Sequence, residues 1–154
     1  MPVEINFDFS RKLAGIIEGN LLNYCYQCGA CVGDCPTARF DENFNPRRIM
    51  LEALYGLEKR LISRESPIWN CSNCYTCYER CPQRVKPVEV ILALKNLAAQ
   101  AGQCPNALMP QVTRCKTTGR SAMVTPATHR IRAELGLPPL QDLPLNELDE
   151  ILKP

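Results

Sequence analysis

Eight of the ten cysteines in this 154-residue chain fall into two copies of one pattern. The pattern is C-x2-C-x2-C-x3-C-P. We call its copies the first frame (residues 25–36, CYQCGACVGDCP) and the second frame (residues 71–82, CSNCYTCYERCP). Cysteine thiolates bind soft metals, so the candidate chemistries are zinc and iron–sulfur. The doubled frame therefore predicts metal sites.

The spacing within a frame favours an iron–sulfur cluster over zinc. Structural zinc sites commonly use one C-x2-C pair and a distant second pair, and only four ligands fit around one ion. A CxxCxxC turn instead directs three sulfurs toward one cubane cluster, and in two-cluster ferredoxins of this spacing the fourth cysteine ligates the other cluster. We therefore expect two [4Fe–4S] clusters. The expected ligands are Cys25, Cys28, Cys31 and Cys81 for one cluster, and Cys71, Cys74, Cys77 and Cys35 for the other.

Residues beside these cysteines suit a cluster-binding loop. Gly29 and Gly33 allow close backbone approach and unusual turn geometry. Pro36 and Pro82 restrict φ and redirect the chain after the fourth cysteine of each frame. Four tyrosines could either screen the clusters from water or simply pack as amphipathic aromatics. They are Tyr24, Tyr26, Tyr75 and Tyr78.

Composition and charge exclude several classes of protein. The formal net charge is +2 with a pI near 8.0, and basic residues are not clustered as nucleic-acid binding requires. The N-terminus lacks the pattern of a secretory signal, and no stretch approaches 18 uninterrupted apolar residues, so no membrane span is expected. A cytoplasmic location follows, and there thiols stay reduced and bind metals rather than form disulfides.

The elements that position the frames are predicted to be helical, and the fold class is all-α. Residues 1–9 alternate apolar and polar side chains, which predicts a short extended arm. From Ser10, a plausible N-cap, the spacing becomes helical and leads into the first frame. The apolar positions of this predicted helix are Leu13, Ile16, Ile17, Leu21 and Tyr24.

Three further helix starts are marked by a proline in the first turn. Asn45-Pro46 begins a helix whose apolar stripe comprises Met50, Leu54, Leu57 and Leu61, with Glu52, Glu58, Lys59 and Arg60 on other faces. Ser66-Pro67 begins another just before Cys71, and Lys86-Pro87 begins a strong helix that stops at Gly102.

The chain beyond Gly102 carries weaker signals. Residues 105–126 are predicted to form a loop, and residues 127–135 (ATHRIRAEL) a short helix. Residues 135–144 contain several prolines and are predicted to form an extended tail, and residues 145–152 (LNELDEIL) a last helix. The predicted organisation is an extended arm (1–9), an α-helical ferredoxin domain with two [4Fe–4S] clusters (10–102), and a loop-rich extension that contacts a partner (103–154).

Three remaining residues carry no clear chemistry. Cys104 and Cys115 lie outside the frames, and a third metal site would need two more ligands. We expect them to be buried free cysteines, with a redox or intersubunit role as the alternative. His129 is the single histidine, for which a surface or capping role is expected.

The frames and their surroundings resemble a known family. YQCGACVGDCP, the largely helical linker and CSNCYTCYERCP resemble the α-helical ferredoxin domain over residues 10–102. With the run CPQRVKPVEVILALKNLA, the chain looks most similar to the C subunit of heterodisulfide reductase.

That resemblance implies an electron-transfer subunit without substrate chemistry of its own. In methanogenic archaea, a flavin-containing A subunit passes electrons through the C subunit to the catalytic B subunit, which reduces the CoM-S-S-CoB heterodisulfide. A hydrogenase or a formate dehydrogenase can join the complex. In keeping with this division, the sequence contains neither a Cys-Cys pair nor a G-x-G-x-x-G motif.

Two alternatives stay open at this stage. The chain could be the iron–sulfur subunit of a related sulfur-oxidising or quinone-linked oxidoreductase. From another class, it could be a zinc-stapled interaction module without a redox role.

Overall fold

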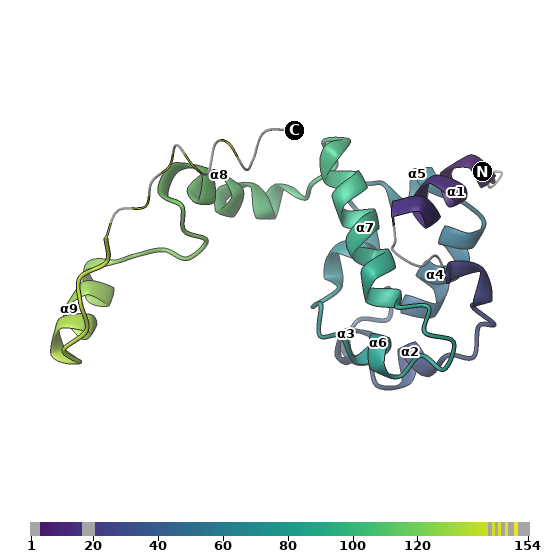
Figure 1. Ribbon diagram of the computed structural model, residues 1–154, viewed down its shortest axis with the longest axis horizontal. Helices are drawn as coiled ribbons and strands as arrows, with labels where there is room; N and C mark the ends of the chain where they lie inside the picture. Colours follow the sequence, from purple (N-terminus) through teal and green to yellow (C-terminus); the bar gives the residue numbers. More distant parts are fainter. Residues whose placement is uncertain are drawn as a thin grey trace. The chain divides into compact units, whose positions relative to one another are not determined.

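The computed structural model describes residues 4–16, 21–141, 143, 145, 147 and 150, and these residues are helical with no strand among them (Figure 1). The all-α prediction is confirmed. The chain divides into two compact units, Met1–Pro105 and Asn106–Pro154. The elements of the first unit are α1 (Phe7–Ile16), the 3-10 helix η1 (Leu22–Tyr24), α2 (Ala30–Gly33), α3 (Pro36–Phe40), α4 (Pro46–Leu54), α5 (Glu58–Leu61), η2 (Pro67–Asn70), α6 (Thr76–Glu79) and α7 (Pro87–Gln100).

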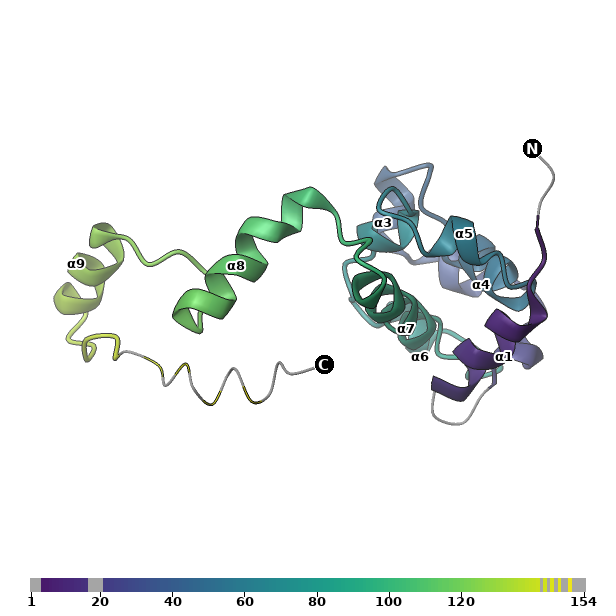
Figure 2. The same cartoon turned by 90° about the horizontal axis from the view of Figure 1, so that it is seen from above.

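The core of the first unit is built by α1, α4 and α7, which contact one another pairwise (Figure 2). Their facing side chains are fully buried: Leu13 in α1, Ile49 and Met50 in α4, and Ile91 and Leu94 in α7 are at most 1% exposed. Each such side chain contributes about 1.5 to 3 kcal/mol of burial free energy. This core forms a rigid support for the two frames.

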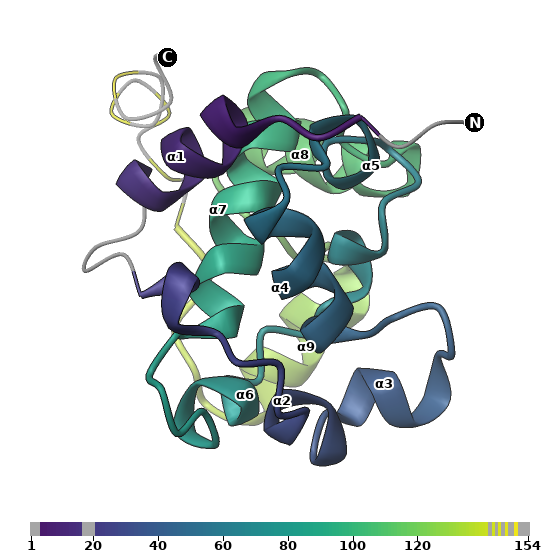
Figure 3. The same ribbon diagram turned by 90° about the vertical axis from the view of Figure 1, so that its right-hand side faces the viewer.

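The short helices of the frames gather at one end of that core. Figures 1 and 3 show α2, α3 and α6 together at the end of the first unit that lies opposite α1. Helix α2 contacts α6 and α4, and α6 contacts α7. Two hydrogen bonds join the segment that follows the first frame to the segment that precedes the second. The backbone carbonyl of Asn70 accepts from the Thr37 hydroxyl, and the Asn70 side chain donates to Asp41.

The predicted boundary between the N-terminal arm and the first helix is wrong. Helix α1 begins at Phe7, so residues 7–9 are helical rather than extended, and Ser10 is a buried residue inside the helix rather than its N-cap. Asn6 caps the helix instead, because its side-chain oxygen accepts hydrogen bonds from the backbone N–H groups of Asp8 and Phe9, each at 3.1 Å. The part of the predicted helix around Ile17 lies outside the described residues, and Leu21 precedes the separate turn η1.

The predicted helix starts at the three prolines are confirmed. The Asn45 side chain accepts from the Arg48 N–H at 3.0 Å, and Pro46 is the first residue of α4. Ser66 caps η2 in the same way, and Pro87 opens α7. All three prolines stand where the missing N–H would have no helical partner.

The apolar stripe from Met50 to Leu61 does not form one helix. Helix α4 ends at Leu54 and α5 begins at Glu58, with Gly56 between them at φ 65°. A Cβ on Gly56 would lie 1.7 Å from the carbonyl oxygen of Asn6, so only glycine allows the start of α1 to approach here. The break between the two helices lets this segment pack against α1.

Glu52 is buried, although the sequence pattern places it on a face other than the apolar stripe. Its side chain is 7% exposed and lies between Arg48 at 2.9 Å and Arg60 at 3.2 Å. The break between α4 and α5 turns Arg60 back toward Glu52, and the two guanidinium groups supply the partners that a buried carboxylate requires.

The second unit contains η3 (Asn106–Leu108), α8 (Met109–Thr118) and α9 (Pro126–Glu134). Helix α9 agrees with the prediction and starts with a Thr125–Thr128 capping box. Helix α8 contradicts the prediction of a loop there. Its Val112 and four threonine or cysteine positions have low helix propensity, which hides the helix in the sequence. The predicted last helix, 145–152, falls largely outside the described residues.

Candidate metal centre

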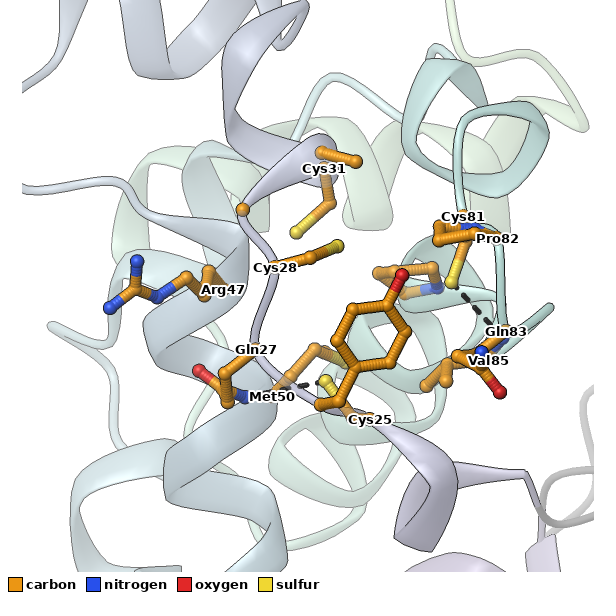
Figure 4. Close-up of a pocket in the computed structure, with 14 residues that line it drawn as sticks. Cys25, Gln27, Cys28, Cys31, Arg47, Met50, Cys81, Pro82, Gln83 and Val85 are labelled. Carbon is orange, nitrogen blue, oxygen red and sulfur yellow. Dashed lines mark hydrogen bonds between the residues drawn. The ribbon is translucent and has the colours of Figure 1, made fainter.

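Four thiols line a pocket beside the first frame. Three come from the first frame and the fourth from the second, and the pocket encloses about 360 Å³, partly open to solvent. Figure 4 shows the sulfurs facing one space from two separate loops. The cysteines are Cys25, Cys28, Cys31 and Cys81, and the remaining wall includes Tyr26, Gly29, Met50, Val85 and Pro87.

A second pocket of about 310 Å³ repeats this arrangement with the frames exchanged. Three of its cysteines come from the second frame and one from the first. Its apolar wall is supplied by α4, α7 and the loop before α4. The cysteines are Cys71, Cys74, Cys77 and Cys35, and the wall includes Phe44, Pro46, Val88 and Ile91.

Both frames use the same backbone conformation to direct their sulfurs. Gln27 and Asn73, at matching positions, have φ of 60° and 54°. Gly29 and Tyr75 match likewise, with φ of 86° and 62°, and each is the N-cap of the following short helix. Glycine suits this left-handed position, but the frame imposes it even on Tyr75, at a cost in backbone strain. Gly33, by contrast, lies inside α2 with ordinary φ.

The two frames also contact each other directly. Asp34 and Arg80 precede the fourth cysteine of their respective frames and form an ion pair at 2.9 Å. Both side chains are half exposed, so the pair contributes at most about 1 kcal/mol. Its effect is to hold each fourth cysteine beside the other frame.

Several thiols receive hydrogen bonds from nearby groups. In the first pocket the Gln27 amide donates to the sulfur of Cys25, and the Val85 N–H donates to that of Cys81, both at 3.3 Å (Figure 4). In the second pocket the Ala38 N–H lies 3.5 Å from the Cys35 sulfur. Such donors stabilise thiolate charge and influence the electronic properties of a bound metal group.

Burial makes the free thiols hard to ionise. The pKa of Cys31 is raised to about 11 and that of Cys77 to about 12. Desolvation is the main cause of both shifts, and charge on neighbouring thiols contributes to them. The backbone N–H of Val88, in the first turn of α7, acts in the opposite direction on Cys77. Four soft donors around one hollow, each needing a positive partner to become a thiolate, fit a thiolate-ligated iron–sulfur cluster.

Lys95 of α7 contacts the second frame, and the sequence reasoning did not anticipate this contact. Its half-buried Nζ donates to the carbonyl oxygen of Cys71 at 2.9 Å and to the side-chain oxygen of Asn73 at 3.3 Å. Desolvation lowers the pKa of Lys95, and charge on the Cys71 thiol acts the other way. Its position in the helix predicted from Pro87 to Gly102 does not indicate that its side chain reaches the second frame.

Of the other residues singled out in the sequence, Cys104, Cys115 and His129 line neither pocket, whereas two of the four tyrosines do line one. Cys104 and Cys115 are half-buried free thiols rather than fully buried ones, and they line neither pocket. His129 is exposed on α9, as expected. Tyr26 and Tyr75 each line a pocket while keeping 58% and 45% of their surface exposed, so they cover the pockets only in part.

No helix within the described part of the chain combines the length and the apolar character needed to cross a bilayer.

Comparison with known proteins matches these features. Residues 21–85 match the family model of a 4Fe-4S dicluster domain. The chain is 36% identical to the C subunit of the H2:CoB-CoM heterodisulfide,ferredoxin reductase of Methanothermobacter marburgensis, over 97% of this chain and 82% of the relative. It is 32% identical to the iron–sulfur C subunit of the CoB–CoM heterodisulfide reductase of Methanopyrus kandleri, again over 97% and 82%. It is 35% identical to the C2 subunit of the H2/formate:CoB-CoM heterodisulfide,ferredoxin reductase of Methanococcus maripaludis, over 84% and 71%.

These matches settle the cofactor. The dicluster domain and the two four-cysteine pockets together mean that the chain carries two [4Fe–4S] clusters, and the zinc alternative is set aside. Because the relatives are matched over most of their length, the resemblance extends well beyond the cysteine frames. The chain belongs to the family of heterodisulfide reductase C subunits.

Proposed function

We propose that this chain relays electrons, one at a time, from a flavin-containing A subunit to a catalytic B subunit that reduces the CoM-S-S-CoB heterodisulfide. A bound [4Fe–4S] cluster supplies one-electron chemistry without proton transfer. The chain's own residues supply the thiolates, exclude water with an apolar wall, and hold the two sites next to each other. The names of the relatives, which include heterodisulfide reductases, support this assignment.

The observation that carries the proposal is the exchange of cysteines between the frames. Each pocket takes three thiols from one frame and one from the other, which supports the proposed ligand sets: Cys25, Cys28, Cys31 and Cys81 for one cluster, and Cys71, Cys74, Cys77 and Cys35 for the other. We infer that this exchange holds the two clusters side by side in one compact unit, as electron relay between two partners requires.

The second unit supports contact with a partner. None of its described residues is buried, and apolar side chains in or next to α8 and α9 remain exposed in segments that also carry basic residues. The exposed apolar side chains include Met109, Val112, Ile131 and Leu135, and the basic ones Arg114, Lys116, Arg120, Arg130 and Arg132. We assign residues 103–154 to binding another subunit of the complex, in which a hydrogenase or formate dehydrogenase can be the electron source. All ten cysteines are free, which suits the reducing cytoplasm.

The ligand exchange is tested by Cys81→Ala and Cys35→Ala in anaerobically purified protein. EPR after reduction should show that Cys81→Ala damages the cluster of Cys25, Cys28 and Cys31, and that Cys35→Ala damages the other. Cys104→Ala, outside both pockets, is the control and should leave both signals intact. Damage confined to the cluster of the mutated frame would contradict the exchange.

The relay is tested by reconstitution of the complex. The flavin-containing and catalytic subunits should reduce the heterodisulfide only when this chain is present and carries both clusters. Co-purification with a haem-containing membrane anchor, instead of a flavoprotein, would point to the quinone-linked alternative.

A further inference from the structure

Lys95 is placed to act on one of the two pockets and not on the other. It projects from α7, whose neighbouring residues Ile91, Leu94 and Ala98 are completely buried in the core. Its ammonium group reaches the carbonyl of Cys71 at 2.9 Å and the Asn73 amide oxygen at 3.3 Å. The lysine therefore holds the entry of the second frame by two hydrogen bonds.

The charge of Lys95 is not cancelled by a carboxylate partner among these contacts. Both acceptors are neutral oxygens, and the charged group that acts on the lysine is the thiol of Cys71. The ammonium and the second pocket thus interact in a partly desolvated region, where a charge acts more strongly than in water.

The other cations near the frames are paired or exposed. Arg80 pairs with Asp34 at 2.9 Å, and Lys86 pairs with Glu89 at 3.6 Å. In each pair, the carboxylate largely cancels the electric field of the cation beyond the pair itself.

The first pocket has a different polar neighbour. In the first frame, the position that corresponds to Asn73 is occupied by Gln27, a neutral amide that donates to the Cys25 sulfur at 3.3 Å. The cation that lines this pocket is Arg47, which is solvent-exposed and whose guanidinium points away from the sulfurs in Figure 4. Water screens such an exposed charge.

We propose that Lys95 makes the cluster of the second pocket easier to reduce than the cluster of the first, and so directs electrons from the first pocket to the second. Reduction adds one negative charge to a cluster, and a nearby partly buried cation stabilises that charge. In the transfer, one electron leaves the first cluster and enters the second, and no bond or proton changes. The inference rests on the ligand sets given under Proposed function.

The test is a redox titration of the full chain, purified without oxygen and carrying both clusters, with EPR detection of each reduced cluster. Cys35→Ala and Cys81→Ala assign the two signals. In Lys95→Met, the equilibrium constant for reducing the second cluster should fall at least about tenfold, which is about 59 mV for one electron. The first cluster should shift much less.

Three further variants separate charge from structure. Lys95→Arg keeps the positive charge and should retain most of the wild-type potential. Lys59→Met removes the same charge from an exposed ion pair with Glu4, away from both pockets, and should shift neither cluster. Asn73→Asp keeps Lys95 but sets a carboxylate beside it, and should lower the second potential in the same direction as Lys95→Met.

The outcomes are distinguishable from failure of the proposed function. If the protein loads both clusters and Lys95→Met shifts neither potential, or shifts both equally, the inference is overturned while the relay proposal stands. If every Lys95 variant, including Lys95→Arg, loses the second cluster and Asn73→Asp leaves its potential unchanged, Lys95 has a structural role alone and the inference is again overturned. Absence of two EPR-active clusters in the wild-type chain would instead contradict the proposed function.

Discussion

Cys31 in α2 and Cys77 in α6, the third cysteines of the two frames, lie on two helices that contact each other. Burial is the main cause that raises the pKa of Cys77 to about 12, and charge on Cys31 adds to the effect although Cys31 lines the other pocket. The two helices contact each other directly. Because Cys31 lines the first pocket and Cys77 the second, the two pockets lie next to each other across this helix contact.

This adjacency predicts magnetic coupling between the two reduced clusters. When both carry an unpaired electron, their EPR spectrum should be broadened and split compared with that of a half-reduced sample. The Cys35→Ala variant, which retains one cluster, supplies the uncoupled reference. A fully reduced wild-type spectrum equal to the sum of two isolated clusters would show that the pockets are too far apart.

Cluster loading should release protons and become more favourable as pH rises. The thiols of Cys31 and Cys77, with pKa of about 11 and about 12, are protonated in the cluster-free protein at neutral pH, whereas the ligands of a cluster are thiolates. Each of these thiols must therefore lose a proton on loading, and acid favours the unloaded state. Cluster loading should continue to become more favourable with rising pH up to the raised pKa values of these two thiols.

The measurement is iron retention against a fixed chelator concentration, from about pH 6 to about pH 9, where loading releases protons. Retention should increase steadily with pH, with a proton release detectable in weakly buffered solution. Cys74 should contribute least, because the hydroxyl of Thr76 lowers the pKa of that thiol. Retention that does not change with pH would contradict the prediction.

Gly56→Ala should destabilise the first unit strongly. The added Cβ would meet the carbonyl oxygen of Asn6 at 1.7 Å, and the residue would also have to keep a φ of 65°. Left-handed backbone alone costs about 1 kcal/mol for alanine, and the steric conflict adds to it. We expect a total loss of more than about 2 kcal/mol in the free energy of unfolding.

Gly102→Ala is the matched control. Gly102 has a φ of 71°, but nothing lies within 4 Å of the position that a Cβ would take, so this variant should lose about 1 kcal/mol from backbone strain alone. Thermal or denaturant unfolding of the cluster-loaded protein measures the loss of unfolding free energy in each variant. Equal losses in the two variants would show that the approach of Asn6 to Gly56 contributes nothing.

Removal of residues 106–154 should separate cluster binding from complex assembly. Both pockets and all the buried core residues belong to the first unit, so the shortened chain should keep both EPR signals and a cooperative unfolding transition. Binding to the other subunits should fall at least about tenfold, which is about 1.4 kcal/mol. Undiminished co-purification with the partners would contradict a docking role for α8 and α9.

Local patterns in the sequence determined much of the fold. The cysteine spacing identified the two cluster-binding frames, and Asn45-Pro46, Ser66-Pro67 and Lys86-Pro87 marked helix starts that the structure contains. These signals are readable because they depend on hydrogen bonds and φ restrictions within a few residues. Even the grouping of Cys81 with the first frame follows from a spacing rule.

Only the tertiary structure decided the features that depend on contacts between distant segments. The sequence places Glu52 outside the apolar stripe of its helix and gives Lys95 no special place. In the structure, Glu52 pairs with Arg48 and Arg60, and Lys95 donates a hydrogen bond to the carbonyl of Cys71. Helix periodicity gives the direction of a side chain relative to its own helix but not which other segment packs there. Gly56 shows the same limit, because the need for glycine arises from the approach of Asn6, 50 positions earlier in the chain.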